Sequence, residues 1–264
     1  MNYSKFMKKN FFFKIKIFFN SRKVFKNWYI FSNVYFGIEK KSHVTFETKN
    51  NLKLKIRTKS TDLMALTNVW LIQEYVHNDF QIKKNDVIID IGAHIGLFSL
   101  FASQYCKNGK IFSFEPIKEN FELLMDNINS NSIKNIHAFN LAVNKEGNKV
   151  KIFCKQDDSA HSMFGEDTKT VFANAISLKR IFDDNKIEQC DFLKIDCEGA
   201  EYDIIDSLPI EYFTRINKMM IEYHFADSKY ELSKKLISKI KDVGFIVETT
   251  PHYDDMGFLY ARRI

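Results

Sequence analysis

The sequence contains few residues that break helices and strands, and few that could crosslink the chain. It has only 3 Pro and 9 Gly among 264 residues. Its 45% hydrophobic and 27% charged residues match soluble globular proteins, which excludes wholesale disorder and collagen-like structure. The 4 Cys form no C-x-x-C pair, and their spacing is not that of a disulfide framework. This favours a reducing compartment over an extracellular one. We therefore expect a cytoplasmic location and a core that needs no disulfide or metal.

The start of the chain lacks an apolar run long enough to cross a bilayer and the small-residue cleavage site of an export signal. It carries instead a basic, aromatic-rich arm, which we define as residues 1–51. Residues 1–59 contain 15 Lys and Arg against 2 Asp and Glu, whereas residues 60–264 contain 24 against 31. We therefore divide the chain into this N-terminal extension and a mildly acidic domain at 52–264.

The mixture of basic and aromatic residues in the arm fits several roles. A helix on an anionic membrane surface, a nucleic-acid contact and a partner-docking segment all use this composition. A packed extension with a solvated face would explain it equally well. The membrane alternative makes the protein membrane-peripheral and assigns lipid contact to Phe11, Phe12, Phe13, Lys14, Ile15, Lys16, Ile17, Phe18 and Phe19.

Hydrophobic periodicity predicts an α/β fold. Residues 52–57 alternate like a half-buried strand, and residues 61–76 have helical spacing. From residue 86 on, short apolar runs alternate with amphipathic stretches, as in a mostly parallel sheet with crossover helices. The last two strands, 245–250 and 257–264, are joined by a loop too short for a crossover helix, so the last strand must be antiparallel. The other expected strands are 87–92, 110–116, 135–143, 149–153, 191–196 and 218–224, the helices between them include 97–106, 117–130 and 199–208, and 157–170 is expected to be a surface loop.

Two strand ends carry a nucleotide-binding pattern. Ligands of open α/β sheets bind at the carboxyl ends of the strands, and there Asp90 precedes the loop Gly92-Ala93-His94-Ile95-Gly96. The glycines allow a ligand to approach backbone N–H groups closely, while Asp90 disfavours a pyrophosphate and would attract an ammonium or sulfonium group. Glu115, 19 residues after Gly96, can accept hydrogen bonds from both hydroxyls of a ribose. An adenosine with a cationic tail describes S-adenosylmethionine.

Acidic residues gather at two further strand ends. Asp196 ends one strand, Glu198 lies in the next turn, and Glu222 and His224 end another strand; Glu201 is interpreted as a helix-terminal residue favoured by the helix dipole. Mutual repulsion of these groups must be relieved by a raised pKa, a cation or a substrate. Either Asp196, Glu222 or His224 is a general base, or Asp196, Glu198 and Glu222 hold a divalent cation. The residues leave both arrangements open, and we favour base catalysis without a metal.

Five blocks of the domain match one known family in sequence and order. They are VIIDIGAHIGLFSL (87–100), FSFEP (112–116), NLAV (140–143), LKIDCEGAEYDII (193–205) and MIEYH (220–224). In these blocks the chain resembles the FkbM-type methyltransferases, which are class I S-adenosylmethionine-dependent enzymes. The resemblance covers about residues 52–264. It implies a seven-stranded Rossmann-like fold, methyl transfer to a hydroxyl of a sugar, glycolipid or other small metabolite, and a cofactor site that includes Ala142. His94 stands where the family usually has asparagine, and Lys179 replaces an aspartate of the family.

Three rival functions fit the sequence less well. A nicotinamide-dependent oxidoreductase needs a glycine-rich phosphate turn, which is lacking. A nucleic-acid methyltransferase could use the arm, but the N-P-P-Y type block and the Pro-Cys nucleophile are both absent. A non-catalytic descendant that binds a partner through its arm is the third alternative, and turnover with a panel of acceptors would discriminate it from the enzyme. The expected partner is a small-molecule, glycan or glycolipid acceptor rather than a nucleic acid.

Overall fold

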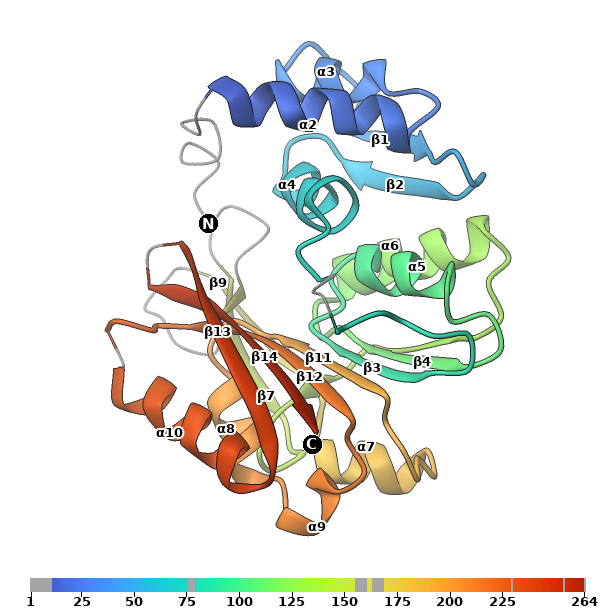
Figure 1. The fold of residues 1–264 in the computed structure, drawn as a ribbon. Helices are drawn as coiled ribbons and strands as arrows, with labels where there is room; N and C mark the ends of the chain where they lie inside the picture. The colour runs from blue at the N-terminus through green and yellow to red at the C-terminus, as the bar shows by residue number, and fades with distance from the viewer. Residues whose placement is uncertain are drawn as a thin grey trace.

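The structure is a computed structural model that describes residues 11–75, 79–154, 161–162, 169–228, 230–253 and 255–263. Its centre is a seven-stranded sheet (Figure 1). All neighbouring strands are parallel except at β14, which is antiparallel to both of its neighbours. This confirms the α/β fold and the antiparallel last strand. The order across the sheet is β13 (Phe245–Tyr253), β14 (Met256–Arg263), β12 (Lys218–His224), β11 (Phe192–Asp196), β3 (Val87–Ile91), β4 (Lys110–Phe114) and β5 (Ile136–Phe139).

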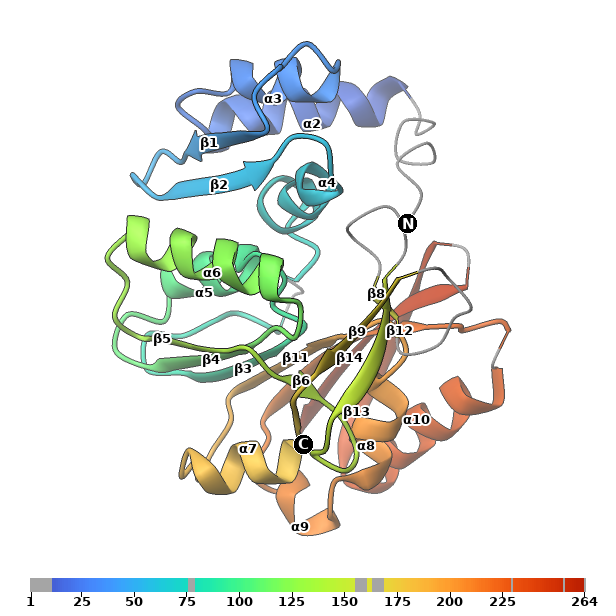
Figure 2. The same ribbon diagram turned by 180° about the vertical axis from the view of Figure 1, so that it is seen from behind.

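Helices cover both faces of the sheet, which explains why the central strands are apolar almost throughout. Successive strand residues point to opposite faces, so Ile88 and Phe192 belong to one hydrophobic cluster while Ile89 and Leu193 belong to another. Figures 1 and 2 show helices α5 and α6 over the first face and α7, α8 and α10 over the second. The bounds are α5 (Leu97–Ser103), α6 (Lys118–Ser130), α7 (Leu178–Asp184), α8 (Glu201–Ser207), α9 (Ile210–Phe213) and α10 (Tyr230–Asp242).

The N-terminal arm packs on the domain beyond α6 (Figure 2). Its buried side chains, among them Ile17, Phe25 and Phe31, join the same hydrophobic cluster as α5 and α6. The described part of the arm, residues 11–51, is thus packed on the domain. The proposed boundary between residues 51 and 52 lies in the turn of the antiparallel β1–β2 hairpin. The elements are α2 (Phe11–Val24), α3 (Tyr29–Tyr35), β1 (His43–Glu47), β2 (Lys53–Arg57), α4 (Asp62–Leu66) and the π-helix η1 (Thr67–Ile72).

Part of the arm that was assigned to a lipid surface faces the protein instead. Ile17 is 3% exposed, whereas Phe19 is 54% exposed, and the side chains of Phe11 and Phe12 lie outside the described residues. None of the described helices is both long and apolar enough to span a membrane.

Three local expectations differ from the structure. The predicted helix 61–76 ends at Ile72, because Gln73 adopts a left-handed conformation with φ of 57°. The predicted strand 135–143 is divided into β5 and β6 (Ala142–Val143), and β6 pairs with β10 (Ala175–Ile176) in a separate small sheet. The prediction of a surface loop at 157–170 is wrong at 161–162 and 169–170, which belong to strands. The other residues of that segment lie outside the described residues. Strands β8 (His161–Ser162) and β9 (Lys169–Ala173) pair with β7 (Val150–Cys154), because apolar side chains of β7 and β9 share a small cluster with Ile117.

Candidate active site

A cavity opens at the carboxyl ends of β3, β4, β11 and β12. This is the edge at which open α/β sheets bind ligands. Most of the residues predicted for the site line this cavity, whereas Asp90, Gly96 and His224 do not. The lining residues that the sequence predicted are Gly92, Ala93, His94, Glu115, Ala142, Asp196, Glu198 and Glu222.

The loop after β3 passes very close to the end of β11. Gly92 has φ of +75°, and a Cβ built there would lie 1.7 Å from the carbonyl oxygen of Asp196. Glycine is therefore required by backbone conformation and by close approach. Gly96, with φ of +85°, instead faces the Leu124 side chain of α6, so it serves helix packing rather than approach of a ligand. His94 has φ of +51°, an uncommon conformation for a residue with a side chain.

Glu115 holds this loop from the neighbouring strand. Its Oε2 accepts a hydrogen bond from the His94 backbone N–H at 2.8 Å, and its Oε1 accepts from the Ile117 N–H at 2.9 Å and from Asn120 Nδ2 at 3.4 Å. Burial raises the pKa of Glu115 to about 7, although these donors act in the opposite direction. A carboxylate offers about four lone-pair sites. The three donors therefore leave room on this carboxylate to accept from a ribose hydroxyl.

Asp90 does not face the cavity, which corrects its predicted contact with a cationic ligand. Its carboxylate is fully buried, accepts a hydrogen bond from Ser99 Oγ at 2.6 Å and lies 3.1 Å from Lys194 Nζ. Lys194 also donates to the Gly92 carbonyl at 2.8 Å and lies 3.7 Å from Asp196. Burial lowers the pKa of Lys194, but Asp90 and Asp196 outweigh it and the pKa rises. The sequence analysis missed Lys194, although a lysine within an apolar strand is a signal of a buried ion pair.

A second network that the sequence analysis missed reaches the loop from the N-terminal hairpin. The Arg57 guanidinium donates to both carboxylate oxygens of Asp62, to Asn120 Oδ1 at 2.8 Å, and lies 3.2 Å from His94 Nε2. Asp62 is fully buried. Burial acts to raise the pKa of Asp62, but Arg57 and His94 outweigh it and the pKa is lowered. The loop after β3 is thus held from both sides.

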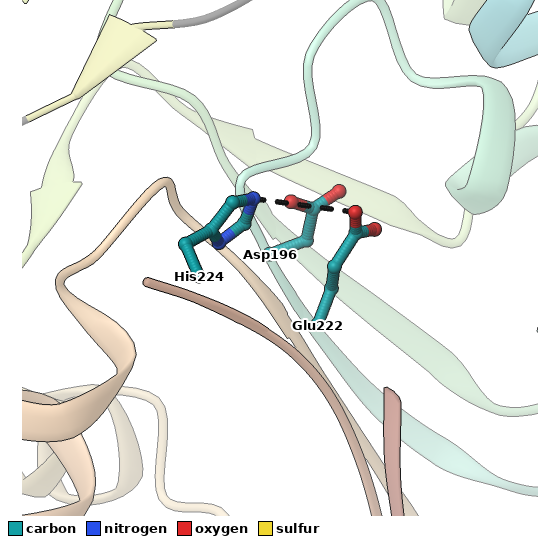
Figure 3. Close-up of side chains that lie close together, drawn as sticks. All are labelled: Asp196, Glu222 and His224. Carbon is teal, nitrogen blue, oxygen red and sulfur yellow. Dashed lines mark ion pairs between the residues drawn. The ribbon is translucent and has the colours of Figure 1, made fainter. Parts of the chain in front are cut away.

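Three predicted catalytic residues converge on one spot (Figure 3). Asp196 and Glu222 are register partners on the parallel strands β11 and β12. His224 lies two residues beyond Glu222, and residues two apart share a face of a strand. One ligand atom from each of the three side chains lies within 4.8 Å of the other two. The sequence predicted a cation site of Asp196, Glu198 and Glu222. The cluster in the structure shares Asp196 and Glu222 with that set but has His224 in place of Glu198.

Glu201 orients the imidazole of His224, which is more than the helix-terminal role that the sequence analysis gave it. Glu201 is fully buried, and its Oε1 accepts from the His224 N–H at 2.6 Å and lies 3.2 Å from His224 Nδ1. Its Oε2 accepts from the Gly199 N–H at 2.7 Å. Glu198, in a left-handed conformation with φ of 54°, places Oε2 3.6 Å from His224 Nε2.

Burial and neighbouring charges raise the pKa of several groups in the cluster, which favours their protonated forms. Burial raises the pKa of Glu222 well above its usual range, and Asp196 raises it further. Burial also raises the pKa of Glu198. For His224 burial acts to lower the pKa, but Glu198 and Glu201 outweigh it and the pKa is raised well above its usual value. A protonated imidazole is therefore the form that these carboxylates stabilise.

Comparison with known proteins decides the family. The family model described as the Methyltransferase FkbM domain matches residues 90–247, more than half of the chain. The chain belongs to the FkbM methyltransferase family. It is similar to "Methyltransferase 1" of Beauveria bassiana (strain ARSEF 2860), 22% identical over 62% of this chain and 78% of that protein. It is also similar to "Methyltransferase sdnD" of Sordaria araneosa, 23% identical over 58% of this chain and 71% of that protein.

Solved structures include a member of the same family. The crystal structure of Methyltransferase FkbM from Methylobacillus flagellatus KT matches with a TM-score of 0.48 and 14% identity, over 94% of this chain and 58% of that one. TYW2 of M. jannaschii in complex with AdoMet matches with a TM-score of 0.45 and 12% identity, over 86% of this chain and 89% of that one.

The two residues that the resemblance marked as departures from the family lie in different places in the structure of this FkbM methyltransferase. His94 lines the cavity and contacts Arg57. Lys179 lies on α7 with its Nζ 2.6 Å from Asp183, and half of its side chain is exposed. His94 is therefore placed to affect the cavity, whereas Lys179 forms an ion pair at the surface.

As a member of this family, the protein is an S-adenosylmethionine-dependent methyltransferase, and the cavity fits that cofactor. Gly92 and Ala93 bring backbone to its wall, Glu115 provides a carboxylate, and Ile117 and Val143 provide apolar surface. Such a wall suits the hydroxyls of a ribose and the flat face of an adenine. Asp196, Glu198 and Glu222 make another part of the cavity wall acidic, on the side left for an acceptor.

Proposed function

We propose that this methyltransferase methylates a hydroxyl oxygen of a small acceptor, such as a sugar, a glycolipid or another metabolite. When bound, S-adenosylmethionine supplies a methyl group whose transfer forms a C–O bond and breaks the S–C bond, leaving that electron pair on sulfur. The acceptor hydroxyl must lose its proton to a protein group or to solvent. The observation that carries the proposal is that proton-accepting groups and the residues for the cofactor line one cavity.

The residues of the chain perform two tasks in this reaction. The wall that contains Asp196, Glu198 and Glu222 accepts hydrogen bonds from the acceptor hydroxyl and orients its oxygen, because carboxylates are strong acceptors. A carboxylate of this wall in its ionised form can take the hydroxyl proton, and the protonated His224 beside it stabilises that ionised form. Tyr75 supports the arrangement, because its hydroxyl donates to Asp196 at 3.4 Å. In-line methyl transfer depends mainly on such positioning.

Turnover with a panel of hydroxyl, amine and nucleic-acid acceptors tests the proposal. We expect methylation of a hydroxyl acceptor, and we expect Asp196→Asn to abolish turnover while the affinity for S-adenosylmethionine, measured by calorimetry, changes little. Glu211→Gln, which removes an exposed carboxylate on α9, is the matched control and should keep full turnover. Full activity of Asp196→Asn, or methylation confined to amines or nucleic acid, would reject the proposal. Cofactor binding without turnover on any acceptor would favour a non-catalytic role.

A further inference from the structure

The Asp196–Glu222–His224 cluster brings three metal-ligating atoms together. These atoms, one from each side chain, lie within 4.8 Å of one another. Carboxylate and imidazole ligands lie about 2.0 to 2.2 Å from a bound transition-metal ion, so two ligand atoms can be at most about 4.4 Å apart. Small side-chain rotations at the ends of two rigid, adjacent strands are enough to close the set.

His224 provides an independent observation that points to a ligand. Its side chain is only 5% exposed, and its Nε2 has no hydrogen-bond partner among the described residues. That atom lies 3.6 Å from Glu198 Oε2 and 4.0 Å from Glu222 Oε1, which is too far for a hydrogen bond to either (Figure 3). A buried polar atom without a hydrogen-bond partner destabilises the folded state. A cation at this spot would remove that destabilisation.

Glu201 gives His224 the arrangement of a metal-ligating histidine. Such a histidine usually directs its second ring nitrogen to a carboxylate, which sets the tautomer and the ring orientation. Here Nδ1 lies 3.2 Å from Glu201 Oε1, and backbone N–H groups of His224 and Gly199 hold that carboxylate. A cation that displaces the proton from Nε2 would leave the ring proton on Nδ1, directed at Glu201, and would free the Nε2 lone pair for coordination.

The charges around the cluster also favour a cation, which could take the place of the protons that the raised pKa values retain there. Asp196, Glu198, Glu201 and Glu222 supply four carboxylates. Lys194 lies 3.7 Å from Asp196, but it is closer, at 3.1 Å, to Asp90. A divalent ion would balance the remaining negative charge at short range.

We propose that Asp196, Glu222 and His224 bind one first-row divalent cation. Two carboxylates and an imidazole suit Mn²⁺, Fe²⁺ or Zn²⁺ better than Ca²⁺, which takes oxygen ligands only. Three protein ligands leave coordination positions open, and a cation there lowers the pKa of a hydroxyl. The inference deepens the proposed function, on which its catalytic role rests. It also replaces the sequence-based preference for a base without a metal.

Binding of Mn²⁺ alone tests the site. The full-length protein, stripped with a chelator, is titrated with Mn²⁺ while electron paramagnetic resonance reports the free ion. We expect one bound ion per chain, and affinity at least about tenfold weaker in Glu222→Gln and His224→Gln. Glu211→Gln is again the matched control and should bind like the parent protein. Circular dichroism establishes that each variant is folded, and Glu222→Gln, which keeps the side-chain shape, decides if His224→Gln is not.

The outcomes separate this inference from the proposed function. No bound Mn²⁺ in the parent protein, or equal affinity in the parent and a folded Glu222→Gln, would overturn the site. Methylation of a hydroxyl that persists in excess chelator, together with absent Mn²⁺ binding, rejects the site and leaves the function standing. Mn²⁺ binding that depends on Glu222, together with no hydroxyl methylation, retains the site and rejects the function.

Discussion

Arg57 and His94 are 37 residues apart, and their side chains meet with Nη2 of Arg57 3.2 Å from Nε2 of His94. Arg57 ends β2 of the N-terminal hairpin, while His94 lies in the cofactor loop. The same guanidinium binds Asp62 and Asn120, and Asn120 donates to Glu115. The hairpin therefore supports the cofactor loop and the carboxylate beside it through one connected set of hydrogen bonds.

Arg57→Met should destabilise the protein strongly. It would leave Asp62, which is fully buried, without its main partner, and breaking a buried ion pair on one side costs about 3 to 5 kcal/mol. The free energy of unfolding, measured with urea, checks this. The double variant Arg57→Met, Asp62→Asn should recover part of the loss, because no charge is then left unpaired. An additive effect of the two substitutions would contradict the coupling.

Glu115 should make cofactor binding depend on pH. Its pKa of about 7 means that the carboxyl is protonated below that pH and ionised above it. An ionised carboxylate accepts a ribose hydrogen bond more strongly, and its ionised fraction rises from about one tenth at pH 6 to nine tenths at pH 8. The affinity for S-adenosylmethionine should therefore rise about tenfold over this range.

Calorimetric titration of Glu115→Gln supplies the control for that prediction. Both proteins meet the same ligand, so any titration of the ligand itself cancels in the ratio of their affinities. Lys194 and His94, the charged or titratable neighbours of this site, are unchanged in the variant. A ratio that stays constant between pH 6 and pH 8 would show that Glu115 is not the group responsible.

Gly92→Ala should cost far more than an alanine at another left-handed glycine. The new Cβ would lie 1.7 Å from the Asp196 carbonyl, so β3 and β11 would have to separate at the active site. Gly37 has a similar φ of +67° but nothing within 4 Å of the added atom, so Gly37→Ala isolates the backbone strain of about 1 kcal/mol. Thermal melts compare the two variants. Equal losses would mean that close approach does not matter at Gly92.

The arm should contribute to stability through its buried aromatic residues. Phe25 is fully buried, and the centroid of its ring lies 4.9 Å from the centroid of the Phe46 ring. Removing a buried phenylalanine costs about 3 to 5 kcal/mol, so Phe25→Ala should lower the free energy of unfolding by this amount. Phe36, 69% exposed on the same arm, is the control, and Phe36→Ala should change stability by less than about 0.5 kcal/mol. A small effect at Phe25 would indicate that the arm is not part of the cooperative unit.

The order of residues along the chain was enough to predict most strands of the sheet and the edge at which the candidate site lies. Apolar runs such as 87–92 and 191–196 are local signals, and the short loop before β14 leaves only an antiparallel connection. The carboxyl ends of parallel strands meet at one edge, so residues that end strands, such as Asp196 and Glu222, could be placed together without coordinates. The family blocks depend on the same local order of residues.

The pairing of charges around that edge could not be predicted from the sequence, because it depends on how the strands are packed. Asp90 is neutralised by Lys194 because β3 and β11 are register neighbours, and the two residues are partners in that register. The roles of Arg57 at the cofactor loop and of Glu201 at His224 likewise depend on how separate elements pack. Ion pairs and hydrogen bonds between elements are set by distances of a few ångströms in three dimensions, which periodicity along the chain does not encode.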